Sequence, residues 1–370
     1  MRILIVGGGV LGTLHAWQAV ERGHDVLQLE REPEARGASV RNFGLVWVSG
    51  RAAGPELATA VRARQLWEQI GKRVPALGFR PNGSLTVVRT DAELAVAHEV
   101  VAAADERGFK LLDAHETRKL NPALRGDFAG ALWCERDAAV EPRTAQPALR
   151  EVLATTGRYR WLPGREVRNL TATGVVDDHG ERHEGDVVLV CTGAWLGGLV
   201  REIAGEIPVR RVRLQMAQTE PLGEPLPTSV ADGDSFRYYP AYRGAALDAL
   251  NESQPQSEIA AQNAMQLLMV QRKDGSLTIG DTHEYTQPFP FDVNEDPYEH
   301  LKKVATALLG RPLPRIRRRW AGVYAQATDP AAIVHRERLS DNAFLITGPG
   351  GRGMTCSPAI AEDTVKELGL

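Results

Sequence analysis

Two glycine-rich turns, one near each end of the chain, carry the residue types that bind a phosphate or another anion. The first turn, residues 7–12, reads GGGVLG and fits the pattern G-x-G-x-x-G. A Cβ at Gly7 would block the tight turn, one at Gly9 would hold a pyrophosphate away, and one at Gly12 would separate the next helix from the strand. Because a helix N-terminus attracts anions, the turn predicts a dinucleotide site.

A carboxylate follows this turn at the spacing of a ribose-binding residue. Arg2–Val6 predicts a first strand, Thr13–Arg22 a helix and Asp25–Leu29 a second strand that ends at Glu30. Glu30 stands 18 positions after Gly12, where an acidic side chain accepts hydrogen bonds from the adenosine ribose. The alternative interpretation of the same residues is a purely structural βαβ unit.

The second turn indicates which dinucleotide is bound. Ala343–Thr347 predicts a strand, residues 348–353 read GPGGRG, and a helix is expected over about Ser357–Leu368. Only 17 residues follow Gly353, so a second βαβ unit with its own ribose carboxylate does not fit. The turn can instead offer N–H groups and a helix dipole to the far end of the first dinucleotide. A flavin ring needs such donors, because its reduced form carries negative charge near N1 and O2.

Composition is typical of a soluble enzyme. The 370 residues are 43% hydrophobic and 25% charged, which suits a large core and two domains, and the formal charge of −3 indicates no nucleic-acid partner. Cys134, Cys191 and Cys356 lie far apart without a C-x-x-C pattern, so neither a disulfide framework nor a metal site is expected, and a reducing cytoplasm is the expected location.

No membrane association is expected either. No segment approaches the ~20 apolar residues of a membrane span. The N-terminal apolar run lacks the length and flanks of a cleavable signal, so we expect Met1 to start the folded domain.

The predicted fold class is α/β (α+β overall). A Rossmann-like cofactor domain is assigned to residues 1–80, 141–215 and 318–370, and it is discontinuous. A second, mainly antiparallel-sheet substrate domain is assigned to residues 81–140 and 216–317.

Within the substrate domain, several segments have recognisable patterns. Ser84–Arg89 predicts a strand and Ala92–Arg107 a helix. Met265–Arg272 and Ser276–Gly280 predict a hairpin around an Asp-Gly turn. The polar stretch Asp248–Asn263 is predicted to be a mobile loop and a candidate lid over the substrate entrance.

With these motifs the chain resembles the FAD-dependent oxidoreductases of the D-amino-acid oxidase, glycine oxidase and sarcosine oxidase group (the DAO family), over nearly its whole length. More narrowly, the strings RNFGLVWVSGR, IGDTHEY and GMTCSPA resemble a bacterial subgroup found beside aminophosphonate-metabolism genes. The family resemblance is carried by the N-terminal fingerprint with Glu30-Arg31, by residues 37–44 (GASVRNFG) and 187–195 (VVLVCTGAW), by Trp320-Ala321-Gly322, and by residues 351–358 (GRGMTCSP).

The resemblance implies noncovalent FAD and a set of cofactor-binding residues. A backbone group at Val167 is expected to meet the adenine, Ser39 to lie near the phosphates, and the segment Ser39–Arg51 to run beneath the flavin. Cys356 stands near the presumed flavin loop, but its GMTCSP context does not match the cysteine attachment sites of relatives. The expected cofactor residues are Gly7, Gly9, Val10, Leu11, Gly12, Glu30, Arg31, Ser39, Arg41, Asn42, Gly44, Val167, Thr192, Gly193, Trp195, Gly351, Arg352, Gly353, Met354 and Thr355.

The chemistry implied is the oxidation of a small amine. A neutral amine would hold its α C–H about 3–3.5 Å from flavin N5 for hydride transfer. The imine product would hydrolyse, and the electrons would pass to dioxygen or to another acceptor. His283 is a candidate acceptor of the ammonium proton near neutral pH, with a structural histidine as its alternative. Arg237 is a candidate for binding an anionic group on the substrate, with a surface salt bridge as its alternative. Tyr239 and Arg41 are further candidates at the site, and the alternative for Arg41 is a solvated loop arginine.

One departure from the family pattern bears on the substrate. Relatives of the glycine oxidase type have an arginine shortly after Trp-Ala-Gly that holds the amino acid's carboxylate, and this chain has Tyr324 there. A phenol cannot make a charge-assisted bidentate contact. Ordinary α-amino acids such as glycine, sarcosine and D-alanine are therefore expected to be poorer substrates than a primary or N-methylated aminoalkylphosphonate.

Two other functions share the N-terminal fingerprint. An NAD(P)-dependent dehydrogenase would use Arg31 for a 2′-phosphate, but it leaves the C-terminal GRGMTCSP turn without a role. A non-catalytic dinucleotide-binding protein is the other alternative. The exact amine, the electron acceptor and the oligomeric state do not follow from the sequence.

Overall fold

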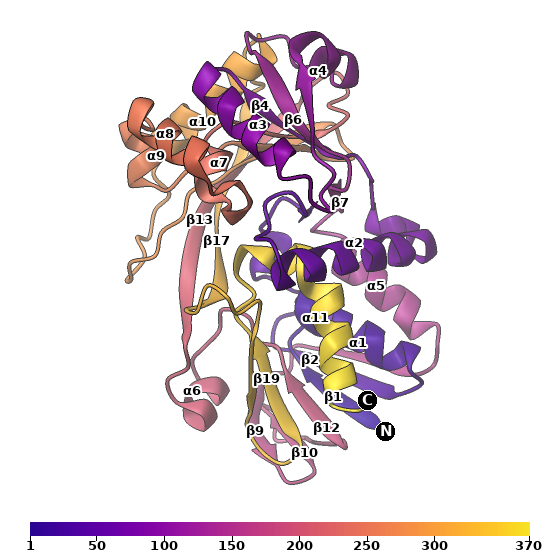
Figure 1. Ribbon diagram of the computed structural model, residues 1–370. Helices are drawn as coiled ribbons and strands as arrows, with labels where there is room; N and C mark the ends of the chain where they lie inside the picture. The colour runs from indigo at the N-terminus through magenta and orange to yellow at the C-terminus, as the bar shows by residue number, and fades with distance from the viewer.

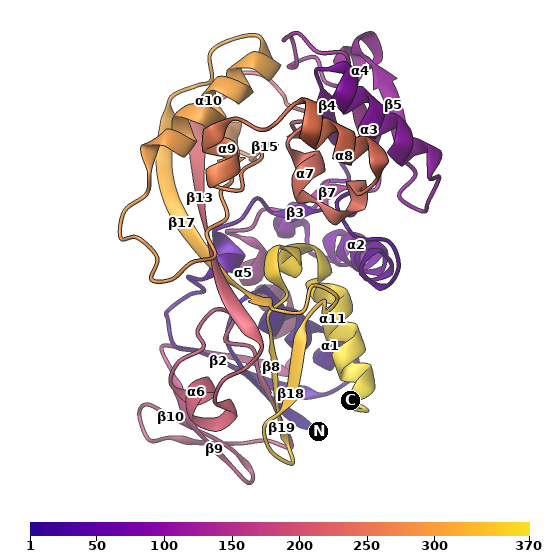
Figure 2. The ribbon, with the colours of Figure 1, turned by 60° about the vertical axis from the view of Figure 1, so that its left-hand side comes forward.

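Two sheets, one in each lobe of the molecule, organise the chain. The computed structural model describes residues 1–370. Figure 1 places a six-stranded sheet in the lower lobe and an eight-stranded sheet in the upper lobe, with strands β13 (Val209–Pro221) and β17 (Ile316–Ala327) running between the lobes. Figure 2, turned by 60°, gives the same arrangement, and the two chain ends lie close together in the lower lobe.

The six-stranded sheet is buried on both faces. Ile3 and Ile5 of its first strand pack in the core formed with three helices, and Leu4 and Val6 point to the other face, where a small three-stranded sheet covers them. All neighbours are parallel except the edge pair β18 and β19. The strand order is β18 (His335–Arg338), β19 (Ala343–Thr347), β12 (Val187–Val190), β1 (Arg2–Val6), β2 (Asp25–Glu30) and β8 (Tyr159–Pro163). The covering elements are α1 (Val10–Glu21), α5 (Ala145–Ala154) and α11 (Gly353–Glu367) on one face and β9 (Val167–Thr171), β10 (Gly174–Asp177) and β11 (Arg182–Glu184) on the other.

The eight-stranded sheet is antiparallel apart from one pair, β14 with β4. One face packs on α10 (Glu295–Leu309), and the other packs in part on α3 (Asp91–Ala102) and α8 (Ala245–Ser253). Its order is β17, β13, β16 (Ser276–Gly280), β15 (Leu268–Gln271), β14 (Ser229–Ala231), β4 (Ser84–Val88), β6 (Gly130–Cys134) and β5 (Lys110–Asp113).

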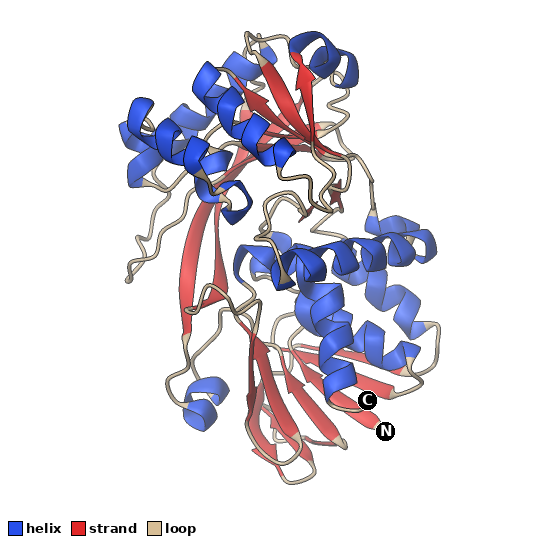
Figure 3. Cartoon of the chain, viewed as in Figure 1, coloured by secondary structure: helices blue, strands red, loops and turns tan.

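Short elements join and cover the sheets, as Figure 3 shows by secondary structure. A two-stranded pair is formed by β3 (Leu45–Val46) and β7 (Ala138–Ala139). The other helices are α2 (Pro55–Arg73), α3 (Asp91–Ala102), α4 (Ala114–Leu120), α6 (Leu199–Ala204), α7 (Ser235–Tyr238), α8 (Ala245–Ser253) and α9 (Glu258–Gln262), with 3-10 turns η1 (Ala38–Val40), η2 (Pro75–Leu77), η3 (Pro240–Tyr242) and η4 (Gly350–Arg352). None of the helices is long and apolar enough to cross a membrane.

The predicted fold class is confirmed, and so is the hairpin. Strands β15 and β16 pair antiparallel around Asp274-Gly275, and Gly275 adopts φ +80°, which the turn requires. The sequence-based domain limits at residues 215 and 318 fall inside β13 and β17, since both strands pass from one lobe to the other. The domain ranges themselves stay a prediction.

The prediction of a mobile loop and lid at Asp248–Asn263 is wrong. Most of this stretch is helical, in α8 and α9, which are joined by a short link after Ser253. Leu247 and Leu250 of α8 are buried with Val96 of α3, and neither α8 nor α9 lines the main cavity. The polar composition reflects the solvent-facing side of two short helices. Helix α3 is also shorter than predicted: it ends at Ala102, whereas the predicted helix extends to Arg107.

The C-terminal helix starts earlier than predicted and contains Pro358. A proline inside a helix leaves the carbonyl four residues earlier without its N–H donor. In α11 that carbonyl belongs to Met354, and it accepts a hydrogen bond from Trp67 Nε1 at 3.0 Å. The indole of α2 therefore replaces the missing donor, and α11 can begin directly at the glycine-rich turn.

Candidate active site

One large cavity lies between the two lobes. It has a volume of about 960 Å³, and 60 residues line it. Because β1, β2, β12 and β19 are parallel, their carboxyl ends meet at one edge of the six-stranded sheet, the usual ligand-binding position of such sheets. Residues that follow these strands line the cavity, among them Gly7, Glu30, Thr192 and Gly350.

The three fingerprint glycines have different surroundings. Gly7 adopts φ +115°, and a Cβ there would lie 2.4 Å from Cys191 O. A Cβ at Gly12 would lie 2.3 Å from Gly7 O, so Gly12 lets α1 pack on the turn and does not itself line the cavity. A Cβ at Gly9 would meet only Ser39 Oγ, at 3.0 Å, and would otherwise project into open space. Gly9 therefore marks a cradle that a ligand can approach.

Helix α1 begins at this cradle. The Val10 N–H donates to Ser39 Oγ at 2.9 Å, and Val10 and Leu11 both line the cavity. The first turn of α1 contains no acidic residue. Its N-terminal dipole and N–H groups therefore favour an anion in the cavity, as the sequence predicts for a pyrophosphate.

Glu30 is held at the carboxyl end of β2 by two backbone donors. Its Oε2 accepts from the Gly8 N–H at 2.7 Å and its Oε1 from the Glu32 N–H at 3.0 Å. The Arg31 guanidinium lies 4.1 Å from the centroid of the Trp195 ring, which is half exposed. Glu30, Arg31, Val167 and Trp195 line the same end of the cavity as the first turn. This is where the sequence places the adenosine.

The segment that follows Ser39 lies along the cavity and is fixed by its own side chains. Asn42 Nδ2 donates to Ala38 O at 2.8 Å, and Arg41 Nη1 donates to Ala321 O of β17 at 3.0 Å. Arg41 and Asn42 line the cavity. Gly44 does not: it adopts φ +69°, and a Cβ there would lie 2.1 Å from Val140 O. Its expected cofactor contact is thus corrected to a role in loop packing.

The second glycine-rich turn faces the same cavity. Gly351, Arg352, Gly353, Met354 and Thr355 all line it, at η4 and the start of α11. Arg352 donates a hydrogen bond to Ala332 O and forms an ion pair with Glu56, so its charge is largely neutralised within the protein. Thr355 Oγ1 accepts from the Trp47 N–H and joins this turn to the segment beneath it.

The residues that follow β12 complete this part of the cavity wall. Thr192, Gly193 and Trp195 line the cavity. The Thr192 hydroxyl is buried and has no hydrogen-bond partner in the protein. A buried hydroxyl without a partner is costly unless a ligand supplies one. Together with the Gly9 cradle, this unpartnered hydroxyl fits an elongated polar ligand such as a dinucleotide.

The upper wall of the cavity is aromatic and polar. Tyr238, Tyr239, Tyr285 and Tyr324 all line it. Burial raises the pKa of each phenol, so all four remain neutral at neutral pH. The Tyr324 hydroxyl lies 3.8 Å from the point where a Cβ of Gly351 would be, which places it beside the second turn.

His283 also lines this wall, but its surroundings change the expected proton chemistry. Its Nδ1 is 2.9 Å from Ala264 O, and its ring stacks on Tyr238 with centroids 4.2 Å apart. Burial lowers the pKa of His283 to about 4. The imidazole is therefore neutral at pH 7, and the prediction that it holds the substrate's proton near neutral pH does not fit this environment.

Arg237 does not face the cavity, in contrast to the sequence-based expectation. Its guanidinium donates to Gln254 O and lies 3.5 Å from the Asp234 carboxylate. It is absent from the cavity wall, because α7 turns it toward α8. Four other arginines line the cavity without an ion-pair partner, Arg36, Arg41, Arg211 and Arg243, and the buried Nε of Arg211 has no acceptor.

Sequence reasoning missed two residues of this wall, Tyr285 and Gln266, and it assigned no individual role to Tyr238 or Asp281. Asp281 is 5% exposed and Gln266 is 2% exposed, and both line the cavity. Asp281 and Tyr285 lie in the IGDTHEY string that follows β16. An acidic residue directly after an apolar strand is the signal that could have identified Asp281. Nothing local in the sequence distinguishes Gln266.

Two buried histidines predict acid sensitivity. Burial lowers the pKa of both His15 and His283 to about 4. The unfolded chain binds these protons near pH 6.5, so stability falls as the pH drops from about 6.5 to 4, by about 3 kcal/mol for each histidine. We expect denaturant melts of His15→Leu to show a smaller loss over this range than those of the natural sequence. His179→Gln is the control, since His179 is exposed, and an unchanged slope in His15→Leu would contradict the prediction.

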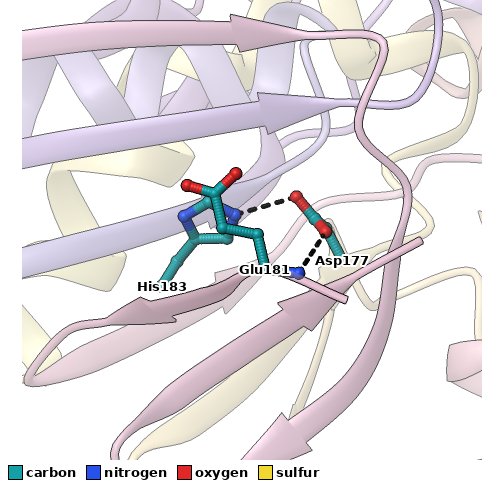
Figure 4. Close-up of side chains that lie close together, drawn as sticks. All are labelled: Asp177, Glu181 and His183. Atoms are coloured by element: carbon teal, nitrogen blue, oxygen red, sulfur yellow. Dashed lines mark hydrogen bonds and ion pairs between the residues drawn. The ribbon is translucent and has the colours of Figure 1, made fainter. Parts of the chain in front are cut away.

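A cluster of possible metal ligands lies outside the cavity, at the β10–β11 hairpin (Figure 4). Asp177 Oδ2 is 2.9 Å from His183 Nε2, and its Oδ1 accepts from the Glu181 N–H. Arg165 Nη1 forms ion pairs with both Asp177 and Glu181, at 2.6 and 2.7 Å. These ligand atoms are thus already bonded to an arginine and to the hairpin itself, which indicates a structural role.

Comparison with known proteins identifies the family. Residues 2–367 match DAO, described as FAD dependent oxidoreductase. The chain belongs to this family. The glycine oxidase of Pseudomonas aeruginosa is 26% identical, over 97% of this chain and 92% of that protein. The glycine oxidase of Pseudomonas putida is also 26% identical, over 97% of this chain and 92% of that protein. The crystal structure of glycine oxidase from Geobacillus kaustophilus superposes with a TM-score of 0.77 at 19% identity, over 99% of this chain and 94% of that one.

The family determines the cofactor, which is FAD, and the cavity fits it. A dinucleotide cradle at Gly9, a carboxylate at Glu30 and a second helix N-terminus at Gly353 face one continuous space. The nicotinamide alternative leaves the second turn without a role. As a DAO family member the chain is an FAD-dependent oxidoreductase, and the two Pseudomonas relatives named above are glycine oxidases.

Proposed function

We propose that this protein oxidises a small primary or N-methylated amine that carries an anionic group, with an aminoalkylphosphonate as the substrate class. The observation that carries the proposal is Tyr324, a buried neutral phenol in the cavity wall, where the family resemblance leads us to expect an arginine. Arg211 and Arg243 supply positive charge at the same cavity without ion-pair partners in the protein. These features favour a substrate whose anionic group lies away from the α-carbon of the amine.

The proposed residue roles differ between the FAD end and the substrate end of the cavity. Bound FAD would supply the electron acceptor for the amine, and the imine would hydrolyse to a carbonyl compound and an amine or ammonia. Tyr239, Tyr324, His283 and Arg41 would shape the substrate space. The reduced cofactor would then pass its electrons to dioxygen or to another oxidant. The proposed location of the protein is the cytoplasm. The residues that would hold FAD are Gly7, Gly9, Val10, Leu11, Glu30, Arg31, Ser39, Arg41, Asn42, Val167, Thr192, Gly193, Trp195, Gly351, Arg352, Gly353, Met354 and Thr355, and Gly12 would act only by packing α1 on the turn.

Noncovalent attachment of FAD is supported by the cysteines. Cys356 is fully buried in the core cluster, does not line the cavity, and has a pKa raised by burial to about 11. Burial also raises the pKa of Cys191, which does line the cavity. Neither thiol is set up to become a thiolate nucleophile. Acid precipitation should leave the yellow colour in the supernatant, and a yellow pellet would refute this.

The substrate class is tested by anaerobic absorbance titration. We expect 2-aminoethylphosphonate or its N-methyl derivative to bleach the bound flavin, with a kcat/KM at least about ten-fold above those of glycine, sarcosine and D-alanine, as loss of a bidentate carboxylate contact implies. Equal kcat/KM for glycine and the best aminophosphonate would refute the phosphonate assignment. Lack of bleaching by any amine would favour the non-catalytic dinucleotide-binding alternative.

A further inference from the structure

Three buried side chains meet in the upper wall of the cavity. They are Gln266, Asp281 and His283, which are 2%, 5% and 5% exposed. Gln266 Nε2 donates to Asp281 Oδ1 at 3.0 Å, and His283 Nε2 lies 3.7 Å from Asp281 Oδ2. All three line the cavity. We refer to them as the acceptor cluster.

The cluster has more acceptors than donors. The Nδ1 of His283 is bonded to Ala264 O, so in the neutral ring this nitrogen carries the hydrogen and Nε2 is an acceptor. Asp281 Oδ2 is an acceptor as well, and Gln266 Oε1 is buried without any donor. Only the Gln266 amide supplies N–H groups within the cluster. Buried acceptors without donors are costly, so the cluster is completed by a ligand rich in N–H groups.

The charges and rings around the cluster favour a cationic ligand. The only ion-pair partner of Asp281 is His283, which is neutral at pH 7, so no arginine or lysine compensates this carboxyl group. Burial raises the pKa of Asp281 well above its usual range, because no cation of the protein stabilises its charged form, and a bound ammonium group would supply that stabilisation. Tyr238 stacks on His283, and Tyr239 lies against Tyr238 with centroids 5.0 Å apart. Aromatic rings beside a carboxyl group form a good environment for an alkylammonium group.

We propose that the acceptor cluster binds the ammonium group of the substrate and that Asp281 takes one of its protons. The N–H groups would donate to Asp281 Oδ2, His283 Nε2 and Gln266 Oε1. The step is R–NH₃⁺ plus carboxylate giving R–NH₂ plus carboxylic acid, in which an N–H bond breaks, an O–H bond forms and the nitrogen keeps the electron pair. This deepens the proposed function and rests on it, because the amine must be neutral before it is oxidised.

The first test measures binding without turnover. tert-Butylamine has no α-hydrogen and cannot become an imine, and tert-butanol is its uncharged analogue. Both are titrated against the FAD-loaded protein and followed by the visible absorbance of the bound cofactor. We expect the natural protein to bind the ammonium about ten- to a hundred-fold more tightly than the alcohol. Asp281→Asn should lose this preference.

Asp232→Asn is the matched control. Asp232 is buried, accepts a hydrogen bond from the Leu267 N–H at 3.0 Å and does not line the cavity. It should keep the preference for the ammonium, and melting curves and FAD content establish that both variants fold. A preference retained in Asp281→Asn, lost equally in Asp232→Asn, or absent from the natural protein would overturn the proposal. Amine-dependent bleaching is measured separately, so a failed cation site and a failed oxidase are distinguishable.

The second test separates proton acceptance from packing. The groups that face Asp281 are the His283 imidazole and the phenols of Tyr238, Tyr239 and Tyr324, with Tyr285 beyond them, and all are neutral at pH 7. We expect Asp281→Asn to slow flavin reduction by the amine at pH 7, and the deficit to shrink toward pH 10, where a much larger fraction of the free amine is neutral. A deficit of the same size at both pH values would overturn the proton-acceptor role.

Discussion

Replacing Gly9 with leucine is expected to give a folded but colourless protein. A Cβ at Gly9 meets only Ser39 Oγ, at 3.0 Å, and the remaining atoms of a leucine would extend into the cavity between α1 and the opposite wall. The side chain would occupy the space of the pyrophosphate and cover the N–H groups at the start of α1. We expect loss of FAD affinity of at least about a hundred-fold, measured by absorbance after reconstitution with excess FAD.

Gly12→Ala provides the contrast. A Cβ at Gly12 would lie 2.3 Å from Gly7 O, a backbone atom that cannot move aside without shifting the turn. This variant is expected to lower the melting temperature of the apoprotein, whereas Gly9→Leu should leave it nearly unchanged. Full FAD occupancy in Gly9→Leu would refute the proposed pyrophosphate position, since the leucine and the cofactor cannot share that space.

Asp137→Ala is expected to destabilise the protein by about 3–5 kcal/mol. Asp137 is fully buried and accepts four hydrogen bonds, from the N–H groups of Val48 and Ser49 and from the hydroxyls of Ser49 and Ser84, at 2.6 to 3.0 Å. Its removal would leave two backbone N–H groups buried without acceptors, at roughly 1–3 kcal/mol each, and would open a void. Denaturant unfolding measures the change.

The effect should extend to the cofactor, because the Asp137 bonds hold the chain just after Trp47, which lines the cavity. Asp137→Asn keeps one carbonyl acceptor and is expected to lose about half as much stability. Asp341→Ala is the control, since its side chain is fully exposed, and it should change stability by less than about 0.5 kcal/mol. If Asp137→Ala changed the free energy of unfolding by as little as this control, the four hydrogen bonds of Asp137 would contribute little to stability.

The predictions for the cofactor half of the site rest on local patterns in the sequence. The apolar run before Gly7, the glycine spacing and the position of Glu30 all act within one βαβ unit, where strand, turn and helix are fixed by neighbouring residues. The hairpin around Asp274-Gly275 was predictable for the same reason, because a three-residue loop that ends in a glycine is a local requirement.

The substrate half could not be predicted in the same way. Arg237 and Tyr239 are two positions apart, yet only Tyr239 lines the cavity, because the short helix α7 points the arginine toward Gln254. The stretch around Asp248 looked like a loop because its polar residues outnumber the two leucines that bury α8. Gln266 and Asp281 meet only when β15 and β16 lie side by side.

By itself, then, the sequence determined the family, the α/β class, the FAD fingerprint and the replacement of an expected arginine by Tyr324. Only the tertiary structure decided which side chains line the upper wall of the cavity. Side-chain direction depends on helix phase and on strand register across the sheet, and both are set by packing between segments far apart in the chain. The acceptor cluster at Asp281 arises from that packing.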